Sequence, residues 1–299
     1  MDHWTIIFDI IGDYDDLTKL RLVCKDFKKH IHKRQINGLN VNIENVYVLW
    51  ILNKQLRYLD CSYNQLSYLP ELPNNVILDC SHNYQLSYLP DLPNNIILNC
   101  SQTNLNCLPD LPKNKQLKCS KNRLTYLPEL PNNEKLKCNR NQLIYLPELP
   151  NNEKLECSHN KLTCLPYLPS NKYLYCSYNK LTSLPELSYN EYLYCCDNEL
   201  TCLPELLNNV ILDCSYNKLK FLPDLKINEY LYCCDNELTC LPQIPNNVIL
   251  DCSYNKLTVL PNLPNNEQLY CYKNQIFCFP ELPKNVKLYC RYQTTNPNN

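Results

Sequence analysis

Hydrophobic and polar positions recur at a fixed interval along most of the chain. A Leu-Pro step occurs at Leu69 and Leu89, then every 19 residues as far as Leu260, and Phe279 takes the leucine position in the last copy. A constant period of this length is typical of stacked structural repeats. The pattern therefore predicts a repeat solenoid, mainly β, over residues 56–292.

Each repeat carries the phrase Leu-x-Cys-x-x-Asn-x-Leu-x-x-Leu-Pro-x-Leu-Pro. The Leu-x-Cys alternation predicts a short strand that turns both side chains inward. Of the 22 prolines, 21 fall in copies of this phrase, and they favour an extended or polyproline return arm because proline lacks the donor that a helix needs. One repeat cannot bury its own leucines, so we expect a curved stack of about 12–13 rungs with parallel strands on its concave face.

Asparagine occupies two positions in the repeat. The residue three after each cysteine is Asn in eleven of twelve copies, beginning at Asn64, and Thr103 is the exception. We expect these side chains to hydrogen-bond the backbone at a sharp corner. The second position begins at Asn75. Since the chain has only two glycines, we expect the Asn75 class to hold a turn position, in a left-handed or a turn conformation.

The phrase resembles the leucine-rich repeat, and specifically its short Leu-Pro-x-Leu-Pro class, known from bacterial effector proteins. This sequence departs from that class by one missing residue before the strand leucine and by Cys where Leu is usual. The Asn-, Tyr-, Lys- and Ile-rich composition also resembles repeat families of AT-rich genomes, including giant viruses of amoebae. That resemblance implies a virus protein acting in the host cytoplasm.

Residues 1–36 lack the repeat and show apolar residues three and four apart, which predicts a small α-helical N-terminal module. The run Leu-Arg-Leu-Val-Cys-Lys-Asp-Phe at 20–27 is similar to the F-box, although Trp4 and Tyr14 depart from its pattern. The resemblance implies binding to a Skp-type adaptor of a cullin-based ubiquitin ligase through Ile10, Ile11, Leu17, Leu20, Leu22, Val23, Cys24 and Phe27. The alternative is a helical cap on the first repeat. Residues 37–55 are expected to be a linker or N-terminal cap, and 293–299 a flexible polar tail.

The 21 cysteines would suggest disulfides in a secreted protein, but thirteen of them, from Cys61 to Cys290, share the inward position. We therefore expect a column of buried free thiols and a reducing compartment, the cytoplasm or nucleus. The alternatives for the column are partial oxidation and metal binding. No secretion signal is evident at the N-terminus. There is no Cys-x-x-Cys and there are few histidines, so no metal site is expected. The net charge of −1 favours neither nucleic acid nor a membrane surface.

No phosphate-binding loop, nucleophile elbow or zinc-protease motif occurs, so we expect no enzyme, cofactor or small-molecule ligand. The residues flanking Leu-x-Cys are expected to face the concave side and bind a protein. The middle repeats are basic there and the later ones rich in tyrosine and aspartate, which suits a partner with an acidic patch. A merely solvated sheet face is the alternative. The candidate contact residues are Lys118, Lys121, Lys135, Lys137, Arg140, Tyr173, Tyr175, Tyr192, Tyr194, Tyr230 and Tyr232.

The segment 190–203 recurs identically at 228–241, which indicates that blocks of two repeats were duplicated. Cys196 and Cys234 are then copies of one event, and we expect them to be inert, exposed thiols. Two functions follow from the whole sequence. One is an F-box-type substrate receptor whose concave face binds the target, and the other is a stand-alone leucine-rich-repeat scaffold.

Overall fold

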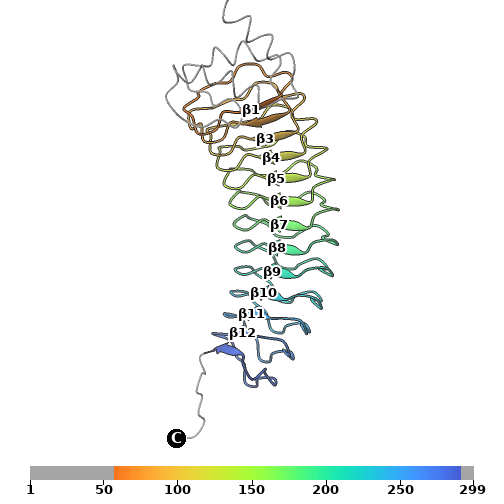
Figure 1. Ribbon diagram of the computed structural model, residues 1–299. Helices are drawn as coiled ribbons and strands as arrows, with labels where there is room; N and C mark the ends of the chain where they lie inside the picture. Colours follow the sequence, from red (N-terminus) through yellow and green to blue (C-terminus); the bar gives the residue numbers. More distant parts are fainter. Residues whose placement is uncertain (1–56, 291–299) are drawn as a thin grey trace, which may run out of the picture.

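The computed structural model describes residues 57–290. The predictions for residues 1–36, 37–55 and 293–299 lie outside this range. The described chain forms a solenoid in which every repeat contributes one strand of three residues, and no helix occurs within it. Figure 1 shows the repeats stacked in chain order along one curved column.

The strands form one parallel sheet whose order follows the sequence. Its members are β1 (Tyr58–Asp60), β2 (Ile77–Asp79), β3 (Ile97–Asn99), β4 (Gln116–Lys118), β5 (Lys135–Lys137), β6 (Lys154–Glu156), β7 (Tyr173–Tyr175), β8 (Tyr192–Tyr194), β9 (Ile211–Asp213), β10 (Tyr230–Tyr232), β11 (Ile249–Asp251), β12 (Gln268–Tyr270) and β13 (Lys287–Tyr289). Central leucines pair in register, as Leu59 does with Leu78. The predicted solenoid is therefore confirmed.

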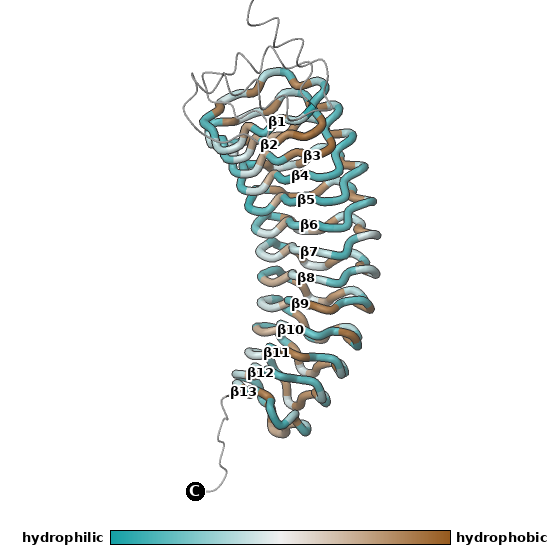
Figure 2. Tube along the Cα trace, viewed as in Figure 1, coloured by the Kyte–Doolittle hydropathy of each residue, from teal (hydrophilic) through white to brown (hydrophobic). Residues whose placement is uncertain are grey.

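Leucine and cysteine side chains build one continuous core. In β1, for example, Leu59 and the following Cys61 are fully buried, as the alternation predicted. The leucines of the return arm close the core from the other side, among them Leu66, Leu69 and Leu72. Each fully buried leucine contributes about 1.5–3 kcal/mol. Figure 2 shows the hydrophobic segments recurring in each repeat, one above another.

The asparagines that follow the cysteines bind the backbone at the corner, as predicted. Asn83 Nδ2 donates to the carbonyl oxygens of Cys80 and of Cys61 in the preceding repeat, each at 2.9 Å. Its Oδ1 accepts the Leu66 N–H, also of the preceding repeat, at 2.9 Å. The exception, Thr103, donates through Oγ1 to the Cys100 carbonyl at 2.9 Å. These side chains join neighbouring repeats as well as holding the corner.

The Asn75 class lies at a turn, as predicted, since the Asn75 N–H donates to the Leu72 carbonyl at 3.1 Å, but the left-handed alternative was wrong. From Asn75 to Asn266 these asparagines are fully buried and do not take positive φ. They are used for their amides: Asn114 Nδ2 donates to Asn95 Oδ1 at 3.1 Å, and Asn133 repeats the contact to Asn114. Positive φ falls instead on the residue two after each cysteine, where the chain leaves the strand. These residues are Tyr63, His82, Gln102, Lys121, Arg140, His159, Tyr178, Asp197, Tyr216, Asp235, Tyr254 and Lys273.

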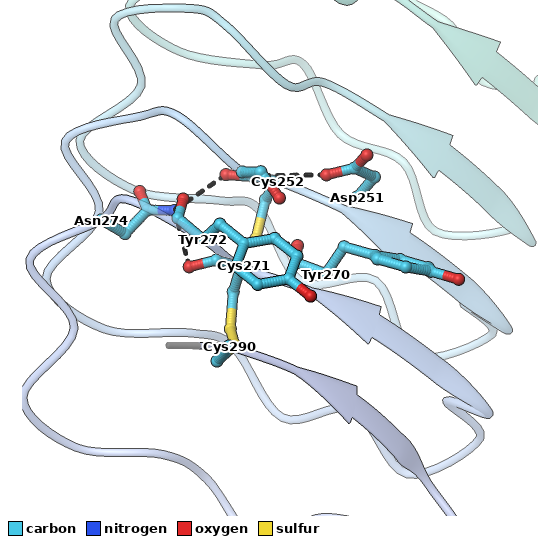
Figure 3. Close-up of a disulfide and its surroundings, with 8 residues drawn as sticks. Asp251, Cys252, Tyr270, Cys271, Tyr272, Asn274 and Cys290 are labelled. Atoms are coloured by element: carbon cyan, nitrogen blue, oxygen red, sulfur yellow. Dashed lines mark hydrogen bonds between the residues drawn. A yellow bond between two sulfur atoms is a disulfide. The ribbon is translucent and has the colours of Figure 1, made fainter. Parts of the chain in front are cut away.

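A second correction concerns the cysteine column. Eleven of its members, from Cys61 to Cys252, are free and buried, but Cys271 and Cys290 form a disulfide (Figure 3). The parallel register explains the pairing, because it sets equivalent cysteines of adjacent repeats side by side. The Cα atoms of Cys271 and Cys290 are 5.1 Å apart, within the range that a disulfide spans.

Candidate functional site: the outer face of the sheet

The outward residues of the sheet fall into three straight rows, because every strand pairs in register with the next. The strand-start row holds the first residue of each strand, and the strand-end row holds the third. The corner row holds the positive-φ residues named above. Neighbours within a row are one strand apart, about 4.8 Å. We call these three rows together the sheet face.

The structure brings the five predicted basic residues together on two adjacent repeats. Lys118 and Lys137 are neighbours in the strand-end row, Lys121 and Arg140 are neighbours in the corner row, and Lys135 is in the strand-start row. Lys137 is half-buried, and the other four are exposed. We call these five residues the basic centre.

A single carboxylate partly neutralises the edge of this patch. Glu156 of β6 pairs with Lys137 at 2.9 Å and with Lys154 at 3.1 Å. Burial opposes its charge, but the hydrogen bonds from the two lysines prevail and hold the pKa of Glu156 below its ordinary value. Within residues 57–290 no ion pair involves Lys118, Lys121, Lys135 or Arg140. Those four charges are available to a partner.

Four of the six predicted tyrosines stack in pairs across β7 and β8. The rings of Tyr173 and Tyr192 have centroids 5.0 Å apart, and those of Tyr175 and Tyr194 are 4.9 Å apart. Lys154 Nζ lies 5.4 Å from the Tyr175 ring centroid. The stacked tyrosines therefore continue directly from the basic part of the sheet face.

The other two predicted tyrosines do not join these stacks. Tyr230 and Tyr232 belong to β10, and β9 separates them from β8 by presenting Ile211 and Asp213 in the same rows. The residue types predicted here are correct, but the six tyrosines do not form one group.

An alternation of tyrosine and aspartate runs from β8 to β11. The strand-end row reads Tyr194, Asp213, Tyr232, Asp251. The corner row reads Asp197, Tyr216, Asp235, Tyr254. Each of these repeats thus has one tyrosine and one aspartate in the two rows, and the two residue types exchange rows from one repeat to the next. We call these eight residues the Tyr/Asp checkerboard. Its signal in the sequence was the duplicated two-repeat block.

Two half-buried cysteines lie between the rows of the checkerboard. Burial, the largest cause, raises the pKa of the Cys196 thiol to about 11 and also raises the pKa of Cys234. Both thiols are therefore protonated near neutral pH, which supports the prediction that they are unreactive. They are half-buried rather than exposed.

Sequence reasoning missed the aromatic contacts in the corner row. Tyr63 stacks on His82 with ring centroids 3.9 Å apart, and His159 stacks on Tyr178 at 4.3 Å. Comparing residues exactly one period apart would have found both pairs.

Among residues 57–290, no three His, Cys, Asp or Glu side chains are placed to hold a metal ion. The described part of the chain also contains no helix that could span a bilayer.

Comparison with solved structures shows that the chain has the leucine-rich-repeat fold. YopM from Yersinia enterocolitica is 34% identical with a TM-score of 0.59, and the match covers 80% of this chain and 64% of that one. YopM, a leucine-rich effector protein from Yersinia pestis, is 28% identical with a TM-score of 0.58 over 92% and 95% of the two chains. This chain thus spans less than two thirds of the first protein and nearly all of the second.

A third similar structure is the functional domain of InlJ from Listeria monocytogenes, which includes a cysteine ladder. It is 23% identical with a TM-score of 0.56, and the match covers 80% of this chain and 63% of that one. No protein-family model and no curated protein sequence matches the chain.

Proposed function

We propose that the chain is a non-enzymatic protein-binding scaffold whose sheet face holds a protein partner. The observation that carries the proposal is the basic centre on β4 and β5, followed across β6 by the stacked tyrosines of β7 and β8 on one continuous parallel sheet. Tyrosine gives a large contact area at low entropic cost and is enriched in protein interfaces. The similarity to leucine-rich-repeat proteins, including an effector, supports the same class of function.

The charges of the basic centre define the complementary surface. Lys118, Lys121, Lys135 and Arg140 make no ion pair in the described chain, so no carboxylate of that part of the chain competes with those of a partner. Opposite charge speeds encounter and fixes orientation. The stacked rings next to these residues supply flat contact area. We therefore expect the partner to present an acidic patch beside an apolar or aromatic one.

Charge reversal tests this proposal. We expect the full-length variant Lys118→Glu/Arg140→Glu to lose at least tenfold in affinity for proteins that the wild type captures. Lys161→Glu/Lys180→Glu is the matched control, because it makes the same change in net charge at exposed lysines outside the three rows. Quantitative pull-down with mass spectrometry measures both. Equal capture by the wild type and both variants would reject the sheet face as the binding site.

A second candidate function is an F-box-type substrate receptor of a cullin-based ubiquitin ligase. The sequence run at 20–27, placed ahead of the repeat array, favours it. In this proposal the N-terminal residues bind a Skp-type adaptor in the cytoplasm or nucleus while the sheet face binds the target. The alternative is that the N-terminal residues only cap the solenoid.

Adaptor binding distinguishes these two possibilities. We expect the full-length chain to bind a purified Skp-type adaptor and Leu20→Glu/Leu22→Glu to abolish that binding. The basic-centre variant, which alters another part of the chain, should bind the adaptor normally. If the wild type does not retain the adaptor, the receptor role is excluded and the scaffold role stands.

A further inference from the structure

The carboxylates of the Tyr/Asp checkerboard have no cationic partner in the described chain. Asp197, Asp213, Asp235 and Asp251 form no ion pair within residues 57–290. Burial raises the pKa of Asp213, and the nearby charge of Asp251 raises it further. The charge of Asp251 thus disfavours the charge of Asp213, and a cation bound between the two carboxylates would relieve this repulsion.

Lysines of the chain itself show how a cation fits this surface. Lys273, which follows Tyr254 in the corner row, has its Nζ 4.8 Å from the Tyr254 ring centroid. At the other side, Lys154 lies over Tyr173 and Tyr175. Between β7 and β11 the three rows contain no lysine or arginine. Within the checkerboard only Tyr254, at its edge, has an ammonium group of the described chain over its ring, and the rings of Tyr194, Tyr216 and Tyr232 have none.

We propose that the checkerboard binds an extended segment of a protein partner that carries regularly spaced arginines or lysines. The carboxylates would pair with the cationic groups, and the tyrosine faces would hold them through cation–π contacts. This inference rests on the proposed protein-binding function and names the chemistry of one partner segment. The sheet face would then bind partner groups of both charges, because the basic centre binds acidic groups and the checkerboard binds basic ones.

The geometry selects a spacing for the partner's charges. Asp213 and Asp251 lie in the same row on either side of β10, so they are two strand spacings apart, about 9.6 Å. Asp197 and Asp235 repeat that spacing in the corner row. A polyproline II segment rises about 3.1 Å per residue, so every third side chain recurs at about 9.3 Å. A β-strand places same-side residues about 6.6 Å apart, which does not match.

Synthetic peptides test the inference on the full-length protein. The probe is a labelled peptide of five Arg-Pro-Pro triplets, and the spacing control has the same composition with its five arginines consecutive. We expect the triplet peptide to bind at least fivefold more tightly than the control by fluorescence anisotropy at physiological salt. Equal affinities would overturn the spacing argument, and no binding of either peptide would overturn the inference.

Two double variants locate the peptide. Asp213→Asn/Asp251→Asn should lower the affinity for the triplet peptide at least tenfold. The amide oxygen can still accept the Ser215 and Ser253 N–H bonds, and thermal melting checks the fold. Glu199→Gln/Glu237→Gln is the matched control, since these carboxylates have the same 38-residue separation but pair with Lys218 and Lys256 outside the rows. Equal loss of affinity in both variants would show non-specific attraction and overturn the proposal.

Failure of this inference and failure of the proposed function give different results. If partner capture depends on the basic centre while the triplet peptide does not bind, the inference fails and the proposed function stands. If neither a protein nor a peptide binds, both fail.

A second copy of the chain could offer its own basic centre. Self-association that disappears in Asp213→Asn/Asp251→Asn, seen by sedimentation velocity, would replace the proposed partner with that copy.

Discussion

At the scale of single residues, buried amides organise each repeat. Asn152 Nδ2 donates to Asn133 Oδ1 at 3.1 Å, and Asn152 Oδ1 accepts from Asn171 Nδ2 at 3.2 Å. These contacts are fully buried, where an amide without a partner costs more than a made hydrogen bond gains. No such bond occurs between Asn228 and Asn247, and Asn228 Oδ1 has no partner. The side-chain column is therefore interrupted between Asn228 and Asn247.

Truncating one of these amides should destabilise the solenoid. We expect Asn152→Ala to lower the free energy of unfolding by about 1–3 kcal/mol, because it leaves Asn133 Oδ1 buried without its donor and removes one of the two acceptors of Asn171 Nδ2. The neighbouring Asn151 is exposed and donates only to the Pro131 carbonyl. Asn151→Ala should change stability by less than about 0.5 kcal/mol. Urea unfolding followed by circular dichroism measures both, and equal losses would contradict a special role for the buried column.

The left-handed corner residues give a second prediction. Lys121 has a φ of 57°, a region that disfavours most residues but that asparagine visits readily. Lys121→Asn should therefore stabilise the protein by roughly 0.5–1 kcal/mol. Lys118→Asn, in the strand β4 of the same repeat, is the control and should destabilise, since asparagine is poor in strands. The urea midpoint of unfolding should rise for Lys121→Asn and fall for Lys118→Asn. Two changes of the same sign would contradict a specific effect of the left-handed conformation at Lys121.

At the scale of elements, the period fixed which residues point inward. Leucine and cysteine two apart could only form a short strand with one buried face, so Leu59 and Cys61 were placed correctly. The two asparagine classes could not be separated from the sequence alone. Asparagine suits a left-handed corner and a buried amide column equally well, and only the backbone shows that the corner falls on Tyr63 rather than Asn75.

The sequence predicted which residues share a row of the sheet face, but not which of their side chains are in contact. Equivalent positions such as Lys118 and Lys137 had to be neighbours in any in-register stack. The interruption of the tyrosine rows by Ile211 and Asp213 of β9 follows from the period in the same way. The pairing of Glu156 with two lysines does not, because it depends on the conformations of particular side chains. The disulfide was missed for a related reason. The sequence places thirteen cysteines in equivalent positions, and nothing in the pattern distinguishes Cys271 and Cys290 from the other eleven.

The environments of the cysteines predict a clear order of thiol reactivity. Exposed thiols such as Cys164 should alkylate fastest, half-buried Cys196 at least tenfold more slowly near neutral pH, and buried Cys157 only on unfolding. Burial raises the pKa of Cys196 to about 11, so its thiolate fraction and its rate should rise with pH up to that value. Iodoacetamide labelling read by peptide mass spectrometry measures each site. Equal rates at Cys164 and Cys196 would contradict the burial assigned to Cys196.

At the scale of the whole molecule, stability is a sum over neighbouring repeats, since each repeat packs only against the next. An inner strand such as β6 is paired on both sides. The last described strand, β13, pairs only with β12, and its central leucine is only partly buried. Two contacts reinforce this end: the disulfide between Cys271 and Cys290, and the stacking of Tyr270 on Tyr289 with ring centroids 4.4 Å apart.

The disulfide should therefore set how firmly β13 is held. In the oxidised protein, we expect Cys290→Ser to speed amide hydrogen exchange at least tenfold in the peptide covering 282–290 and to leave β6 unchanged, because opening a terminal repeat breaks only one interface. Cys278→Ser, at an exposed thiol in the preceding return arm, is the control and should leave exchange unaltered. A reductant should reproduce the effect of Cys290→Ser in the wild type and add nothing in the variant. Faster exchange spread over all strands would instead mean that the solenoid opens as one unit, against the nearest-neighbour picture.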